Sequence, residues 1–146
     1  MSAFLKRLFL YPGILSAVSL SLPVSDACAQ IPVSNRSEYQ LLKHGVEQFQ
    51  QGHYVLAANS VTEFLGQHFQ PTESLNKETH LLAVQQAKYI LALSNLKAGT
   101  RNSVEEITGY IAETVNPVYR QRAAFALAQY YFKENNLPAA IENYEL

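Results

Sequence analysis

The histidines and closely spaced acidic residues are the side chains of this sequence best suited to hold a metal or to transfer protons. The four histidines are His44, His53, His68 and His80. No two of them are four residues apart, which is the spacing of a helical zinc site. His44 and Glu47 share one helical face, but one histidine and one glutamate supply at most half of a metal site. We therefore expect ordinary surface or interface histidines and no bound metal.

Glu105 and Glu106 are the adjacent carboxylates that could act as a general acid and base. They follow Ser103 at the start of a predicted helix, where negative charge stabilises the helix dipole. The pattern from Ser103 to Glu106 is typical of a capping box. The sequence contains no phosphate-binding loop, nucleophile elbow or dinucleotide fingerprint. It therefore predicts a protein that is not an enzyme and that binds no cofactor.

The composition narrows the class of protein. The chain has 146 residues, of which 48% are apolar and 16% charged, and its formal charge is −1. These values exclude a charged disordered tail and disfavour a nucleic-acid binder, which would carry a basic surface. A single cysteine excludes a disulfide-stapled miniprotein. One packed domain is expected from this length.

Residues 1–29 have the three parts of a cleaved secretory signal. Lys6 and Arg7 form a positive start, residues 8–22 carry no charge, and Ala27-Cys28-Ala29 is a small-residue cleavage pattern. The uncharged run is shorter than the roughly 20 residues that span a bilayer, which argues against a membrane anchor. We expect an exported, periplasmic protein without an integral membrane span after cleavage. Lipidation at Cys28, with outer-membrane association, is the alternative processing route.

The remaining chain is predicted to be all-α. Residues 30–36 form a short leader, and Ser37 begins a capping box with Gln40. Apolar residues then recur at helical spacing, with glycine, proline and asparagine marking the boundaries. The predicted helices cover residues 37–51, 54–65, 77–98, 103–115 and 117–133, and a last one begins near 137. Six helices in three hairpins follow from this pattern.

Small, turn and aromatic residues return in a similar order in each hairpin. A small residue stands seven positions before a turn residue in the pairs Gly45 and Gly52, Ala92 and Gly99, and Ala128 and Asn135. We expect the first member of each pair to lie where two helices cross, with Ala57 and Ala140 as their small partners. We expect the second member to end a helix in a left-handed conformation.

This order resembles the tetratricopeptide repeat, or TPR. The approximate units are 38–71, 77–116 and 121–146. The repeat positions are Gly45, Gly52, Tyr54, Ala57, Ala92, Gly99, Ala128, Tyr131, Ala140 and Tyr144. The first unit departs from the motif at His44 and Gln48, where leucine and tyrosine are preferred. The resemblance implies a TPR-like α-solenoid of about three antiparallel hairpins, the last one truncated.

TPR proteins bind an extended peptide or a partner helix in a groove lined by the first helix of each hairpin. Carried over by motif position, the resemblance predicts a groove of Leu42, Val46, Phe49, Gln50, Tyr89, Leu93, Leu96, Lys97, Phe125, Gln129, Phe132 and Lys133. Positions 49, 96 and 132 would form an apolar ridge. The same apolar residues are as well suited to packing against neighbouring helices.

The expected function is that of a non-catalytic scaffold for protein–protein interaction in the cell envelope. The chain resembles the N-terminal segments of exported TPR proteins of Bacteroidota, and we expect it to be the first part of a longer protein. A protein or peptide partner is implied, and no nucleic acid. Two alternatives remain: the docking arm of a larger envelope enzyme, and a small TPR lipoprotein of an outer-membrane assembly machine.

Overall fold

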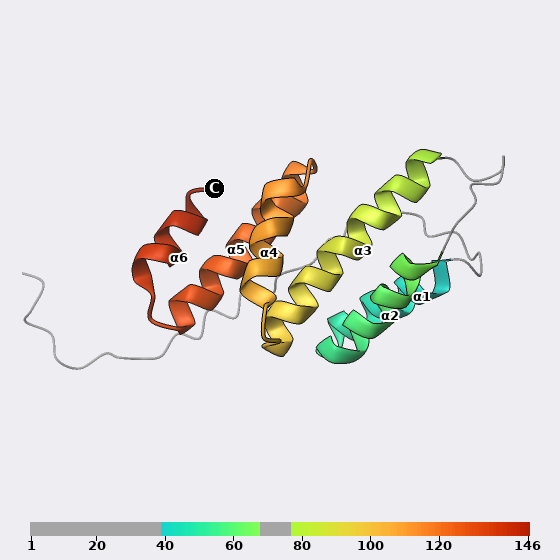
Figure 1. Cartoon of the computed structure of the whole chain (residues 1–146), viewed down its shortest axis with the longest axis horizontal. Helices are drawn as coiled ribbons and strands as arrows, with labels where there is room; N and C mark the ends of the chain where they lie inside the picture. The colour runs from blue at the N-terminus through green and yellow to red at the C-terminus, as the bar shows by residue number, and fades with distance from the viewer. Residues whose placement is uncertain (1–38, 68–76) are drawn as a thin grey trace, which may run out of the picture.

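The computed structural model describes residues 39–67 and 77–146, and all regular secondary structure in them is helical. Figure 1 shows the helices side by side in chain order. Their bounds are α1 Gln40–Gln50, α2 Tyr54–Gly66, α3 Lys77–Ala98, α4 Ser103–Glu113, α5 Pro117–Lys133 and α6 Leu137–Tyr144. The predicted all-α class is confirmed. The predicted segments 1–29 and 30–36, Cys28 and the Ser37 cap lie outside the described residues.

The helix boundaries follow the predicted stop signals closely, with one difference at α4. This helix ends at Glu113, two residues earlier than predicted, because Thr114 and Asn116 are extended, with ψ of 127° and 111°. Asn116 precedes Pro117, and a residue before proline is disfavoured in the helical region. The chain therefore leaves the helix before the proline and begins α5 with it.

Each helix packs against the next one along the chain, and further contacts join α1 to α3 and α3 to α5. The odd-numbered helices are therefore neighbours of one another, and each also packs against an even-numbered helix. A continuous core runs between them. Its largest fully buried apolar side chains come from five helices: Leu42, Phe64, Ile90, Ile107 and Leu127. The longest helix, α3, lies in the middle and touches four others.

Gly45 lies where α1 comes into close contact with α2. A Cβ atom placed there would be 2.5 Å from Val61 Cγ2 and 3.4 Å from the carbonyl oxygen of Ala57. Ala57 and Val61 are themselves fully buried. The expected crossing of small residues is therefore present in the first hairpin, because only a hydrogen fits on the α1 side.

Three of the predicted turn residues adopt left-handed backbone conformations. Gly52, Gly99 and Asn135 have φ of 80°, 68° and 58°, and each follows the end of a helix. The amide of the following residue donates back to the helix in all three turns; His53 N, for example, donates to the oxygen of Gln48 at 2.9 Å. Glycine reaches this region without strain, and asparagine is the residue that most often replaces it.

Polar side chains tie the first hairpin together at a position where the sequence departs from the TPR pattern. Ser60 of α2 donates to Oε1 of Gln48 at 2.8 Å, and Gln48 Nε2 lies 2.9 Å from His44 Nε2. His44 therefore lies within hydrogen-bonding distance of Gln48, one helical turn onward. The two departures from the motif are linked to each other and to α2.

The predicted capping box at Ser103 is not formed. Asn102 precedes the helix without a side-chain cap bond, and Ser103 is buried. Its amide donates to the oxygen of Thr100, while the Glu106 carboxylate accepts a 2.6 Å hydrogen bond from Asn95 Nδ2. The glutamate is therefore used to join α4 to α3. At α5 the predicted cap is present: Asn116 Oδ1 accepts from the amides of Val118 and Tyr119 at 3.0 and 3.3 Å.

Candidate functional site

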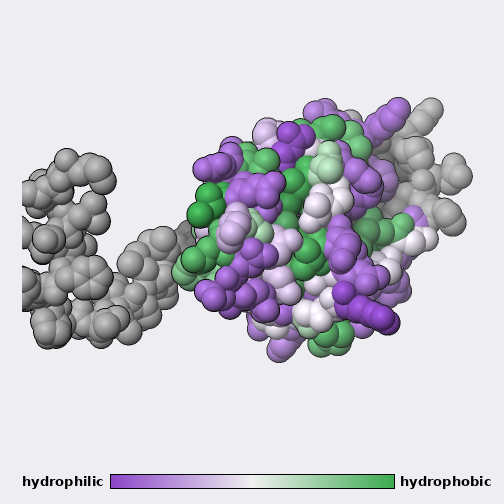
Figure 2. All heavy atoms as spheres, turned by 60° about the vertical axis from the view of Figure 1, so that its left-hand side comes forward, coloured by the Kyte–Doolittle hydropathy of each residue, from purple (hydrophilic) through white to green (hydrophobic). Residues whose placement is uncertain are grey.

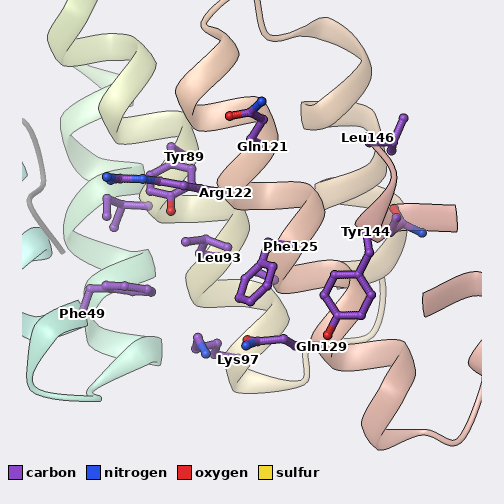
Figure 3. Close-up of a pocket in the computed structure, with 13 residues that line it drawn as sticks. Phe49, Tyr89, Leu93, Lys97, Gln121, Arg122, Phe125, Gln129, Tyr144 and Leu146 are labelled. Carbon is purple, nitrogen blue, oxygen red and sulfur yellow. The ribbon is translucent and has the colours of Figure 1, made fainter. Parts of the chain in front are cut away.

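The odd-numbered helices and the C-terminal residues enclose a hollow of about 510 Å³, the central hollow. Figure 3 shows its side chains converging from several elements. The lining residues are Phe49 of α1; Tyr89, Ile90, Leu93 and Lys97 of α3; Gln121, Arg122, Phe125, Ala126 and Gln129 of α5; and Asn143, Tyr144 and Leu146 at the end of the chain.

Helical spacing explains why these side chains meet. On α5, Arg122, Phe125 and Gln129 follow one another at three- and four-residue steps, which places them on one face. On α3, Leu93 and Lys97 are related in the same way. Phe49 stands in the last turn of α1, on the far side of α3 from α5. Three separate helices therefore present one face each to the same space.

A second hollow of about 380 Å³, the side hollow, lies next to the first. Its lining residues are Tyr54, Leu96, Lys97, Ala98, Gly99, Ala126, Gln129, Tyr130 and Lys133. Lys97, Ala126 and Gln129 line both hollows, so the two are adjacent at this point. Together they follow the face between α3 and α5 from Arg122 to Lys133.

The structure divides the residues expected to line a groove among the central hollow, the side hollow and neither of them. Six of them line the central hollow: Phe49, Tyr89, Leu93, Lys97, Phe125 and Gln129. Leu96 and Lys133 line the side hollow. Gln50 and Phe132 line neither, and Phe132 is 61% exposed. The ridge expected from positions 49, 96 and 132 is thus divided between two hollows and open surface.

Leu42 corrects the sequence-based expectation. It is completely buried among the core residues, so it offers no surface to a ligand. Val46, one turn onward, is only partly buried and packs against the same core. Both side chains are on the face of α1 that meets α2 and α3. Phe49 follows Leu42 by seven residues on the same stripe and also packs against the core, so motif position alone did not show which part of this stripe borders the hollow.

Aromatic side chains build much of the wall. Tyr89 stacks on Tyr119 with ring centroids 4.8 Å apart and planes inclined by 17°. Phe49 packs edge-on against Tyr54 at 5.5 Å, and Phe125 packs in the same manner against Tyr144 at 5.5 Å. Phe125 nevertheless remains 48% exposed. A large apolar ring, held by its neighbour, thus faces the opening.

The end of the molecule beyond Phe125 also exposes apolar groups. They are Leu137, Ile141, Tyr144 and Leu146, each about half exposed or more. Figure 2 brings this end forward and shows apolar surface interspersed with polar side chains. Of this set, Tyr144 and Leu146 also line the central hollow, which places the apolar end next to its opening.

Among the described residues, the charged side chains that line the two hollows are all positive. Lys97, Arg122 and Lys133 line one or both hollows, and no glutamate does. Lys97 and Lys133 are exposed and form no ion pair with another described side chain. Because unlike charges attract more strongly beside low-dielectric walls, these hollows favour an anionic ligand.

Tyr110 lies behind this wall, with its ring 6.2 Å from that of Tyr89. Burial raises the pKa of its phenol above the ordinary value of 10.0. The Thr114 hydroxyl, which donates to the phenol oxygen at 3.4 Å, opposes this by lowering the pKa, and the nearby Tyr119 raises it further. The group stays neutral around pH 7 and serves as a packing residue.

Sequence reasoning did not identify Gln121, Arg122, Asn143 and Leu146 as lining residues, and it gave Tyr144 a structural role only. Helical spacing could have identified Arg122, since it stands three residues before Phe125 on the same helical face. The residues of α6 could not be identified in this way, because their position depends on how the last hairpin folds back onto α5.

None of the histidines in the described part of the chain lines either hollow. His44 and His53 lie outside both, and in the described part of the chain no three histidine, cysteine or acidic residues are grouped as metal ligands. Glu105 and Glu106 stand in the first turn of α4, away from the two hollows. His68 lies outside the described residues. What the site offers is therefore shape, apolar surface, hydrogen-bonding amides and positive charge.

None of the helices in the described ranges is both long enough and apolar enough to cross a membrane. No protein-family model, curated protein or solved structure matches the chain. The function must therefore be inferred from the residues and their arrangement.

Proposed function

We propose that this chain is a non-catalytic, TPR-like α-solenoid that binds a peptide or protein partner in the cell envelope. Its binding surface is formed by the central hollow and the side hollow. The observation that carries the proposal is that α1, α3 and α5, the first helices of three successive pairs, all contribute side chains to the central hollow.

The arrangement of helices supports a solenoid. In a TPR array, the first helices of neighbouring hairpins are adjacent, and here α1 contacts α3 and α3 contacts α5. Gly45 permits close crossing in the first pair, and left-handed residues end the first helix of every pair. Arrays of this kind are defined by one structural unit that repeats along the chain and contacts its neighbours.

The surface chemistry supports binding rather than catalysis. Phe125 provides an exposed ring supported by Tyr144, which is the type of anchor that contributes most to protein interfaces. The amides of Gln121 and Gln129 line the same space and can hydrogen-bond to a peptide backbone. The signal-like sequence of residues 1–29 supports an envelope location.

Selection of peptides tests this function. A displayed library of random dodecapeptides is selected on the immobilised full chain, and enriched peptides are then titrated against the F125A and F132A variants. Both phenylalanines lie on α5 and are well exposed, but only Phe125 lines the central hollow. We expect F125A to weaken binding about tenfold or more and F132A to change it less than twofold.

Two results would contradict the proposed function. The first is a library that yields no peptide enriched over the uncoated support. The second is a set of peptides whose binding F132A weakens as strongly as F125A, since binding would then occur elsewhere on α5.

A further inference from the structure

Two positive side chains of the site stand on one face of α5, and a third comes from α3. Arg122 and Lys133 stand eleven positions apart on α5, close to three full turns, and so they project from one helical face. At 1.5 Å per residue their backbone positions are separated by about 16 Å. Lys97, which approaches from α3, lines both hollows and lies between them.

Apolar and amide groups occupy the intervals between these charges. Phe125 follows Arg122 by one turn, and Gln129 follows Phe125 by one more, before Lys133 is reached. The order along α5 is therefore cationic, aromatic, amide and cationic. A ligand that matches it must carry anionic groups at two places and an apolar group between them.

We propose that the partner segment is an acidic peptide, bound extended along α5, with aspartate or glutamate on both sides of a leucine or aromatic side chain. This inference rests on the proposed function and specifies its partner. An extended chain rises about 3.3 Å per residue, so roughly five residues cover the distance from Arg122 to Lys133. The apolar side chain lies on Phe125, and the flanking carboxylates lie near Arg122 and near Lys97 and Lys133.

The concave shape of the site favours a peptide over a membrane surface. The central hollow encloses about 510 Å³, which a protruding side chain can enter. A bilayer with anionic headgroups presents a broad surface to basic residues and requires them on an outward face. Here Lys97, a residue of α3, lines both hollows together with residues of α5.

The library selection described above gives the first test, through the composition of the enriched peptides. We expect aspartate and glutamate around leucine or an aromatic residue. Enriched peptides that are neutral or basic would overturn the acidic-partner inference and leave the proposed function standing. An absence of any enrichment would overturn both.

Charge reversal gives the second test. Two fluorescein-labelled dodecapeptides are compared, one with glutamates flanking a central phenylalanine and one with lysines in their place. We expect the full chain to bind the glutamate peptide at least tenfold more tightly, with affinity that decreases as salt rises from 50 to 300 mM because charge attraction is screened. The K97E/K133E variant is expected to reverse this preference.

The control is K88E, which reverses an exposed lysine of α3 that lines neither hollow. We expect it to retain the wild-type preference within twofold. A reversed preference in K97E/K133E cannot arise from unfolding, since an unfolded chain gains no affinity for the lysine peptide. Equal binding of the two peptides by the wild-type chain, or binding to phosphatidylglycerol vesicles in place of either peptide, would overturn the inference.

Discussion

Two glycines inside helices have opposite surroundings, one crowded and one open. Gly45 and Gly109 both lie inside helices, α1 and α4. A methyl group at Gly45 would meet Val61 Cγ2, whereas nothing lies within 4 Å of a Cβ atom at Gly109. Glycine is therefore required by packing at one position and is simply a poor helix former at the other.

We expect Gly45→Ala to lower the free energy of unfolding by about 1–3 kcal/mol, since buried Val61 cannot move away without disturbing the core. Gly109→Ala, as the matched control, is expected to raise it by about 0.5–1 kcal/mol. Urea denaturation followed by circular dichroism measures both. The G45A/V61A double variant should cost less than the sum of the single ones, because V61A removes the clashing methyl group. If the double variant loses as much free energy of unfolding as the two single variants together, a direct clash between the two positions is contradicted.

The raised pKa of Tyr110 predicts a loss of stability at high pH. Well below pH 10 the phenol is protonated in both the folded and the unfolded chain, so it contributes no pH dependence there. As the pH rises above 10, the unfolded chain releases the proton more readily, and the free energy of unfolding falls. We expect Y110F to lose less stability than the wild type between pH 8 and 11 in urea denaturation. T114V, which removes the hydroxyl that stabilises the phenolate, should lose more.

At the scale of the helix, the start of α5 depends on Asn116 and the start of α4 does not depend on Ser103. The asparagine side chain accepts two backbone hydrogen bonds, while no side-chain cap is present at α4. Both residues are equally good cap candidates in sequence, so only the backbone conformation distinguishes them. Asn116 is extended, which lets its side chain turn back to the first amides.

Asn116→Ala is therefore expected to lower the free energy of unfolding by about 1 kcal/mol, the usual cost of a lost helix cap. Ser103→Ala should change it by less than about 0.5 kcal/mol, because no cap hydrogen bond is lost. Chemical denaturation of both variants measures the difference. A larger cost for S103A than for N116A would contradict the assignment of the caps.

At the scale of the whole molecule, burial is uneven. The central helix α3 has nine buried residues and α6 has one, Ala140. Stability against local opening depends on buried contacts, so α6 should open without the rest of the molecule. Because Asn143, Tyr144 and Leu146 line the central hollow, opening of α6 would also remove one wall of the site.

We expect the amides of α6 to exchange with deuterium at least about 100-fold faster than those in the middle of α3 in the full chain. An acidic peptide bound to the central hollow should slow exchange in α6, because it contacts the wall that α6 supplies. Native-state hydrogen exchange measures both effects. Equal protection of the two helices without ligand would contradict this description.

The fold was predictable to the extent that it depends on local signals. The α3 bounds, Lys77–Ala98, follow from a long apolar pattern ended by Gly99, and α5 begins at the Asn116–Pro117 pair. The absence of the Ser103 capping box could not be predicted, because Glu106 instead accepts a hydrogen bond from Asn95 of another helix. Local sequence cannot weigh a local hydrogen bond against one supplied by a neighbouring element.

The candidate site was predictable in part for the same reason. Motif position, carried over from the TPR resemblance, selected Phe49, Lys97 and Phe125, which do line one hollow, but it also selected Leu42, which is buried in the core. The sequence by itself determined the all-α class, the order of the helices and the left-handed turns, since these depend on residues close together in the chain. Only the tertiary structure decided which helix faces remain open and that three cations line them, because this depends on the angles at which distant helices pack.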